Sequence, residues 1–157
     1  MTREERFMNE AIALSALGIS SNQGGPFGCV IVQGDDIVGR GHNMVTGTND
    51  PTAHAEVVAI RDACSYLKNY QLNDCEIYTS CEPCPMCMGA IYWARPKKVY
   101  FANTRTDAAN IGFDDSMIYD ELTCKYDERK IPMLPLCRDE ALKIFKQWSE
   151  KTDKTEY

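Results

Sequence analysis

The feature that most constrains this chain is a His-x-Glu motif, His54 and Glu56, followed later in the sequence by a Pro-Cys-x-x-Cys motif that holds Cys84 and Cys87. Zinc prefers nitrogen and sulfur ligands in a tetrahedron, and a catalytic zinc site uses three protein ligands so that water can take the fourth position. His54, Cys84 and Cys87 supply these ligands. Glu56 is then a carboxylate outside the ligand set, suited to take the proton that the attacking water loses. The motifs therefore predict one zinc ion per chain.

The length and composition favour one folded domain. The 157 residues, of which 44% are hydrophobic, predict a single domain over residues 1–157 with a core of its own. The net charge of −6 argues against a nucleic-acid partner, because phosphate-binding surfaces are built from clustered Lys and Arg. No apolar run approaches the length of a membrane span, so no membrane association is expected.

Eight cysteines in a short chain could form a disulfide framework, but the start of the chain argues for a reducing compartment. The chain begins with Met-Thr-Arg-Glu-Glu, which opens a charged helix and is not a secretory signal, so we expect a cytoplasmic protein. Outside the two motif thiols and Cys81, small buried side chains are the expected role for most of the others: Cys29, Cys64, Cys75, Cys124 and Cys137.

Periodicity predicts a first helix and then a β-hairpin. Phe7, Ala11, Leu14 and Leu17 recur at helical spacing and predict one buried helix face that ends near Gly18. Residues 27–32 and 37–38, separated by Gly-Asp-Asp, predict the hairpin, and a loop is expected over residues 43–51.

A second helix is expected to start around Ala53 and to carry a buried stripe of Val57, Ile60, Cys64 and Leu67. The His-x-Glu motif then falls in its first turn. Two residues that are two positions apart within a helix point away from each other, so the motif can serve one ion only at the open end of the helix.

The Cys-x-x-Cys segment is expected at another helix N-terminus. A strand is predicted over residues 76–79, and Pro85 suits the first helical position because its missing N–H is not needed there. Cys84 and Cys87 then share one face near free N–H groups that favour thiolate. Pro83 disfavours a helix before it, which assigns Cys81 to the strand exit.

The rest of the chain alternates in the same way. We expect a strand over residues 98–101 and then an irregular segment. A short helix is expected over 116–122 and a longer one over 138–150. This order predicts an α/β fold with one sheet and helices on both faces. The last helix carries its larger apolar side chains on one side: Ala141, Leu142, Phe145 and Trp148.

His-x-Glu followed by Pro-Cys-x-x-Cys is the zinc signature of nucleobase deaminases. The chain resembles the cytidine deaminase-like superfamily and, in residues 49–56, 87–96, 112–116 and 156–157, its small bacterial guanine deaminases. The resemblance implies a three-layer α/β/α sandwich around a five-stranded mixed sheet. It also implies a homodimer in which the helix and tail of residues 138–157 are swapped between subunits.

The resemblance further implies roles for four residues at a purine site. Asn43 and Asp115 would hydrogen-bond the purine, Phe27 would pack on its ring, and Tyr157 would approach from the crossing tail. Each has an ordinary alternative from sequence alone. Phe27 and Asn43 suit core and turn positions, Asp115 suits a helix cap, and Tyr157 follows a polar stretch typical of a frayed terminus.

The implied activity is zinc-dependent hydrolytic deamination of guanine to xanthine and ammonia, an aminohydrolase reaction of purine catabolism. A buried carboxylate at Asp115 would reject bases that lack guanine's N–H donors. Deamination of another aminated purine, or of a nucleoside such as guanosine, stays open. A tRNA adenosine deaminase is disfavoured by the acidic charge. A structural zinc module would need Cys81 as a fourth ligand and would give Glu56 no task.

Overall fold

The computed structural model describes residues 1–157, which divide into two compact units, Met1–Asp115 and Ser116–Tyr157. The second unit contains only helices, α6 (Ser116–Thr123), a short 3₁₀ turn and α7 (Arg138–Glu150). These bounds confirm both helices expected near the C-terminus. The first unit holds the sheet, and its elements are α1 (Arg3–Ser20), β1 (Gly28–Gln33), β2 (Asp36–His42), α2 (Val45–Thr48), α3 (Ala55–Leu67), β3 (Cys75–Cys81), α4 (Pro85–Ala94), β4 (Lys98–Asn103) and α5 (Arg105–Asn110).

The sheet is mixed and has the strand order β2-β1-β3-β4. β1 pairs antiparallel with both β2 and β3, whereas β3 and β4 run parallel. The parallel pair is joined through α4, which is the crossover that parallel neighbours require. The resemblance implied five strands, but the structure has four, because the chain forms only helices and turns after β4.

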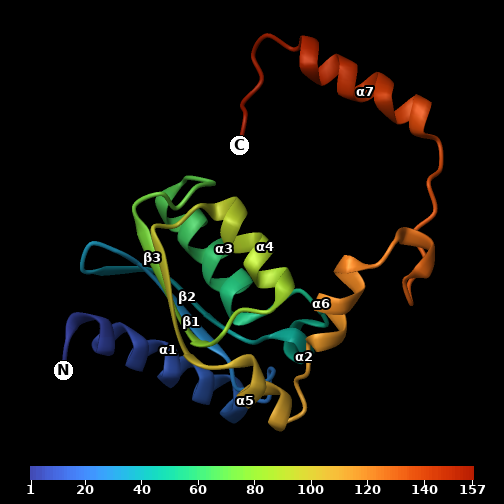
Figure 1. The fold of residues 1–157 in the computed structure, drawn as a ribbon. Helices are drawn as coiled ribbons and strands as arrows, with labels where there is room; N and C mark the ends of the chain where they lie inside the picture. The colour runs from blue at the N-terminus through green and yellow to red at the C-terminus, as the bar shows by residue number, and fades with distance from the viewer. The chain divides into compact units, whose positions relative to one another are not determined.

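The two faces of the sheet carry separate apolar cores, which makes the predicted three-layer arrangement. On one face, Cys29, Ile31 and Ile77 pack with side chains of α3 and α4. On the other face, the alternate strand residues Val30 and Tyr78 pack with side chains of α1. Figure 1 shows α1 on one side of the strands and α3 and α4 on the other. The α/β fold class predicted from the sequence is confirmed.

Helix α1 begins with a capping box, since Thr2 Oγ1 accepts from Glu5 N at 3.1 Å and Thr2 N donates to Glu5 Oε2 at 2.7 Å. Phe7 and Ala11 are buried as expected. Leu17 was expected on the same face and is instead 47% exposed, because the helix continues to Ser20 and buries Gly18 in its place.

Helix α3 starts at Ala55, two residues later than expected. The residues at the centre of its buried face differ from the predicted stripe. Ala59 and Ala63 are fully buried, while Ile60, Cys64 and Leu67 pack at the sides of the same core. Small side chains take the centre because α3 lies against glycines of β2. A Cβ on Gly39 would lie 2.6 Å from the Ala59 carbonyl oxygen, and one on Gly41 would lie 2.2 Å from that of Ala55.

Two segments expected to be irregular contain short helices, α2 and α5. Their sequences are too short and too polar to show an apolar period, so pattern reading misses them. No helix of the structure is long and apolar enough to cross a bilayer.

Candidate zinc centre and active site

His54 stands just outside helix α3. It is the N-cap residue, with extended backbone angles of φ −68° and ψ 155°, and Glu56 lies in the first turn behind it. The expectation that both residues are helical was wrong for His54. The extended conformation explains how two residues only two positions apart can serve one site, because the backbone turns between them.

Cys84 and Cys87 occupy the start of helix α4, as predicted. Cys84 is the N-cap residue, Pro85 opens the helix, and the Cys84 sulfur accepts from the backbone N–H of Cys87 at 3.5 Å. Cys81 ends β3 and turns its sulfur toward the Thr104 carbonyl oxygen at 3.7 Å. Cys81 is therefore not part of the ligand group.

The three predicted ligands converge on one point. His54 Nδ1 lies 3.5 Å from the sulfur of Cys84 and 3.5 Å from that of Cys87. All the ligand atoms fall within 4.8 Å of one another. A tetrahedral zinc ion bonded to sulfur at about 2.3 Å and to nitrogen at about 2.0 Å separates those atoms by about 3.5 Å. The donor set and its spacing thus fit zinc.

The electrostatics of this group favour a cation. Without a metal, the pKa of the Cys84 thiol is lowered to about 4. The hydrogen bond with Cys87 is the largest cause, and the hydrogen bond with His54 lowers the pKa further. The hydrogen bond to Cys84, followed by burial, raises the pKa of Cys87, so the pair holds one proton between its sulfurs. A divalent cation replaces that proton and allows both sulfurs to be thiolates.

Glu56 is buried directly behind the sulfurs, with 6% of its surface exposed. Its Oε1 accepts from Thr79 Oγ1 at 3.3 Å, and its Oε2 lies 3.4 Å from the Cys87 sulfur. Burial raises the pKa of Glu56, which suits a carboxyl that has to hold a proton during a reaction. Thr79 was not singled out from the sequence. The only signal in the sequence was the alternation along the strand, which places Thr79 on the same face as Ile77.

Asn43 directly follows β2 and is buried, with 6% of its surface exposed. Its backbone N–H donates to the Phe27 carbonyl at 3.0 Å, and its side-chain Oδ1 accepts from Gly25 N at 3.3 Å and Val45 N at 3.2 Å. Because two backbone N–H groups bind Oδ1, the amide orientation is fixed and Nδ2 remains as the donor.

Phe27 meets Phe113 edge-on, with ring centroids 4.9 Å apart and planes at 89°. Asp115 follows two residues after Phe113 and ends the first unit. Burial and then the charge of Cys84 raise the pKa of Asp115, so its carboxyl lies within electrostatic reach of the ligand group. Phe113 was not among the residues expected at the site.

Two further residues need to be placed. His42 Nδ1 lies 3.1 Å from the Asn43 carbonyl oxygen and is outside the ligand group, as expected for the second histidine. Tyr157 belongs to the Ser116–Tyr157 unit, and its role at the purine site stays a prediction.

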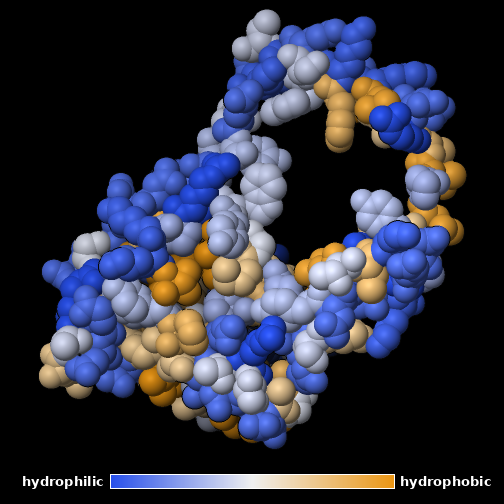
Figure 2. All heavy atoms as spheres, in the orientation of Figure 1, coloured by the Kyte–Doolittle hydropathy of each residue, from blue (hydrophilic) through white to orange (hydrophobic).

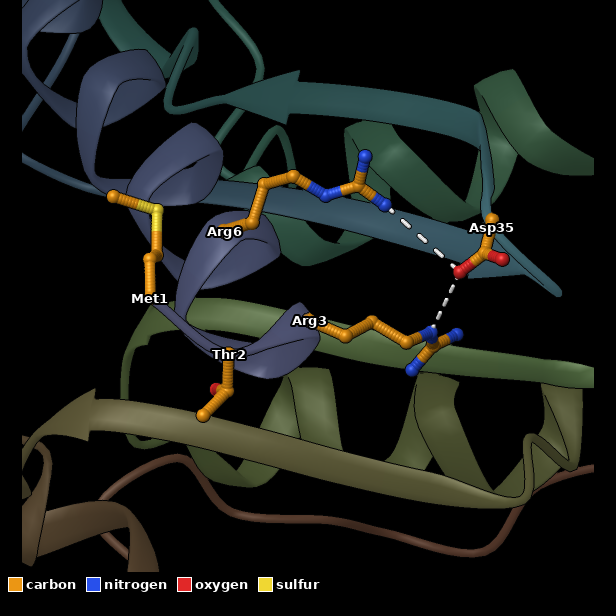
Figure 3. Close-up of a pocket in the computed structure, with 5 residues that line it drawn as sticks. All are labelled: Met1, Thr2, Arg3, Arg6 and Asp35. Carbon is orange, nitrogen blue, oxygen red and sulfur yellow. Dashed lines mark hydrogen bonds and ion pairs between the residues drawn. The ribbon is translucent and has the colours of Figure 1, made fainter.

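A wide surface hollow lies elsewhere, at the start of α1. It is lined by residues 1–3, Arg6 and Asp35 (Figure 3). Both arginines point to the same carboxylate, with Arg3 Nε at 3.0 Å and Arg6 Nη2 at 3.9 Å from Asp35 Oδ1. The hollow contains none of the predicted site residues, and its arginines already pair with Asp35.

Comparison with known proteins agrees with this geometry. The family described as "Cytidine and deoxycytidylate deaminase zinc-binding region" matches residues 1–103. The chain is 54% identical to the guanine deaminase of Bacillus subtilis over 153 residues, which are 98% of each chain. The X-ray structure of that enzyme superimposes with a TM-score of 0.95 over 98% of both chains. A tRNA-specific adenosine deaminase of Aquifex aeolicus is 44% identical over 77 residues, 49% of this chain and 51% of that one.

Proposed function

The chain belongs to the cytidine and deoxycytidylate deaminase zinc-binding family, and we propose that it catalyses the hydrolytic deamination of guanine to xanthine and ammonia. One observation carries the proposal: the convergent His54, Cys84 and Cys87 group, with a buried carboxylate behind it, in a chain 54% identical to a guanine deaminase over 98% of its length.

His54, Cys84 and Cys87 would hold the zinc ion that this family uses. When bound, zinc would act as a Lewis acid that lowers the pKa of its water toward about 7. Glu56 takes the proton of the attacking water and delivers it to a purine ring nitrogen as C2 is attacked. Glu56 then takes the proton of the new hydroxyl on C2 and passes it to the departing amine, so that C2 becomes a carbonyl and ammonia leaves. One carboxylate can serve these transfers because each lies within hydrogen-bond reach of the same centre.

The substrate is recognised by groups at the mouth of this centre. The Asn43 amide Nδ2, whose orientation the two bonds to Oδ1 support, donates to a purine acceptor. Asp115 accepts from the ring N–H and amine of guanine, and Phe27 packs against the ring. A base that lacks those donors leaves the carboxylate unpaired, which costs more binding free energy than a lost apolar contact.

The functional unit in this proposal is a homodimer in which residues 138–157 cross between subunits and Tyr157 approaches the partner's purine site. Apolar side chains on the surface of each unit support a protein interface (Figure 2). In the first unit, Tyr92 is 76% and Trp93 64% exposed on α4. In the second unit, Phe145 is 73% and Trp148 45% exposed, and the two lie three positions apart on α7.

The test is ammonia release by purified protein of known zinc content, with guanine, guanosine, adenine and cytidine assayed in parallel. Release from guanine alone, lost in Glu56→Gln, supports the proposal. Turnover of guanosine in place of guanine would keep the chemistry and enlarge the purine site to include a sugar. If protein with one zinc per chain released no ammonia from any of the four substrates, the guanine assignment would be overturned.

A tRNA adenosine deaminase has less support. The match to the Aquifex aeolicus enzyme covers about half of either chain, whereas the match to the guanine deaminase covers nearly all of both. The net charge of −6 also opposes binding to a polyanion.

A further inference from the structure

Helix α5 is tied to the loop that carries the zinc ligands. Glu82, two residues before Cys84, donates its backbone N–H to the Asn103 carbonyl at 2.8 Å. The Glu82 carboxylate accepts from the backbone N–H of Arg105, at the start of α5, at 2.9 Å. The first turn of α5 also has a capping box between Thr104 and Asp107. The start of α5 is therefore fixed relative to the ligand loop.

The other end of α5 determines where the chain goes next. Gly112 has a φ of +97°, its N–H donates to the Ala109 carbonyl at 3.0 Å, and the N–H of Phe113 donates to the Ala108 carbonyl at 3.0 Å. These two bonds with a left-handed glycine form a Schellman motif. Its geometry fixes the backbone of Phe113 against the end of the helix.

The side chain of Phe113 reaches back to the purine site. Its ring lies edge-on to Phe27, with centroids 4.9 Å apart. Gly25 leaves the space for this pair, because a Cβ there would lie 2.9 Å from Phe113 Cζ and 3.0 Å from Phe27 Cε2. Gly25 also donates its N–H to Asn43 Oδ1 at 3.3 Å. Gly25 thus packs closely against the aromatic pair and also binds the Asn43 amide.

We propose that Phe113 is a positioning residue of the purine site, which sets the plane of the Phe27 ring and, through the turn of residues 112–115, the approach of Asp115. This inference rests on the proposed guanine deamination. Phe113 is 46% exposed, so the core does not account for an aromatic side chain at this position. An edge-on partner holds a ring in one orientation, which is what packing against a flat base requires.

The first test is Phe113→Leu, which keeps an apolar side chain and removes the ring. We expect the KM for guanine to rise about threefold to tenfold, the effect of losing one aromatic pair contact, with kcat within about twofold. Zinc content and melting temperature should not change. The matched control is Phe101→Leu, another half-exposed phenylalanine, on β4.

A second test measures binding without turnover. The dissociation constant for guanine is compared in Glu56→Gln and in Glu56→Gln with Phe113→Leu. It should rise by the same factor as KM. An unchanged KM and dissociation constant in Phe113→Leu, with the wild type active on guanine, would overturn the inference but leave the proposed function intact. An inactive wild type would instead overturn the proposed function.

A third test uses the contact with Gly25. The variant Gly25→Ala forces the two rings apart and should raise the KM in the same way. Leucine at position 113 has no Cζ to meet the new methyl group, so the double variant should be no worse than the poorer single variant. A KM increase equal to the product of the two single effects would mean that the residues act independently, and would overturn the inference.

Discussion

The hydroxyl of Thr79 lies 3.3 Å from Glu56 Oε1, and both side chains are almost completely buried. The other carboxylate oxygen faces the Cys87 sulfur at 3.4 Å. One oxygen is therefore held by the sheet and the other is directed toward the zinc ligands. This division suits a carboxylate that must move a proton at one fixed position.

Removing the Thr79 hydroxyl should slow the reaction without weakening the binding of guanine. In Thr79→Val the carboxylate loses a hydrogen bond of about 1 kcal/mol, so we expect kcat to fall about fivefold. The KM for guanine and the zinc content should not change. Thr79→Ser keeps the hydroxyl and is the matched control. A rise in KM or a loss of zinc that accompanies the fall in kcat would indicate a structural effect.

Replacing Glu56 itself tests the proton transfer. Glu56→Gln keeps the shape and can still receive the Thr79 hydrogen bond, but it cannot take a proton. We expect zinc content and folding to be retained and kcat to fall by about 100-fold to 10,000-fold. The measurement is ammonia release with metal analysis of the same sample. Retained turnover would exclude the assigned role.

Cys84 and Cys81 allow a matched test of the metal site. Cys84→Ser keeps a good N-cap residue for α4, so the helix start survives while the thiolate ligand is lost. We expect zinc content and activity to fall together. Cys81→Ser changes a thiol only three residues away whose sulfur faces Thr104, and it should retain its zinc. Zinc loss in both variants would mean that the loop, and not the ligand, had been damaged.

How much of this site followed from the sequence depends on the kind of feature. The ligand group and Glu56 were predicted because zinc chemistry restricts residue type and spacing so strongly. The helix bounds near them follow less directly from residue pattern, and His54 is an extended N-cap residue. That difference matters, because the extended backbone brings the imidazole and the carboxylate to the same site.

Phe113 and Thr79 could not be found by pattern. Phe113 is placed by a glycine with positive φ and by the cap of a six-residue helix, and neither produces a hydrophobic period. Leu17 shows the opposite failure, since it fits the period of α1 and is exposed. Periodicity predicts that one face is buried, but the close approach of backbones at glycines decides which residues occupy its end.

Acid should weaken the attachment of α1 to the sheet. Arg3 Nη1 donates to Glu76 Oε2 at 2.7 Å, and this bond lowers the pKa of Glu76 from its ordinary value of 4.5. A carboxyl with a lowered folded pKa stabilises the fold above its unfolded pKa, and the contribution is lost as the pH falls through the folded pKa.

Melting temperatures between pH 7 and pH 3 test this contact. At pH 7, Glu76→Gln should melt about 2–4 °C lower than the wild type, if the charged hydrogen bond contributes about 1 kcal/mol. The difference should shrink below pH 4.5, the ordinary value for Glu76. Glu10→Gln, on the exposed side of α1, is the surface control. A difference that persists at low pH would mean that the charge of Glu76 does not contribute.

The proposed exchange of C-terminal tails can be tested by mixing two defective variants. Deletion of Tyr157 should impair guanine turnover, and Glu56→Gln should abolish it, each with zinc retained. If the tail completes the partner's site, a mixed dimer contains one site with an intact Glu56 and an intact Tyr157 from the other subunit. Mixing after partial unfolding and refolding should then restore activity above the sum of the separate variants. If each tail serves its own subunit, no mixed dimer has a complete site and mixing restores nothing.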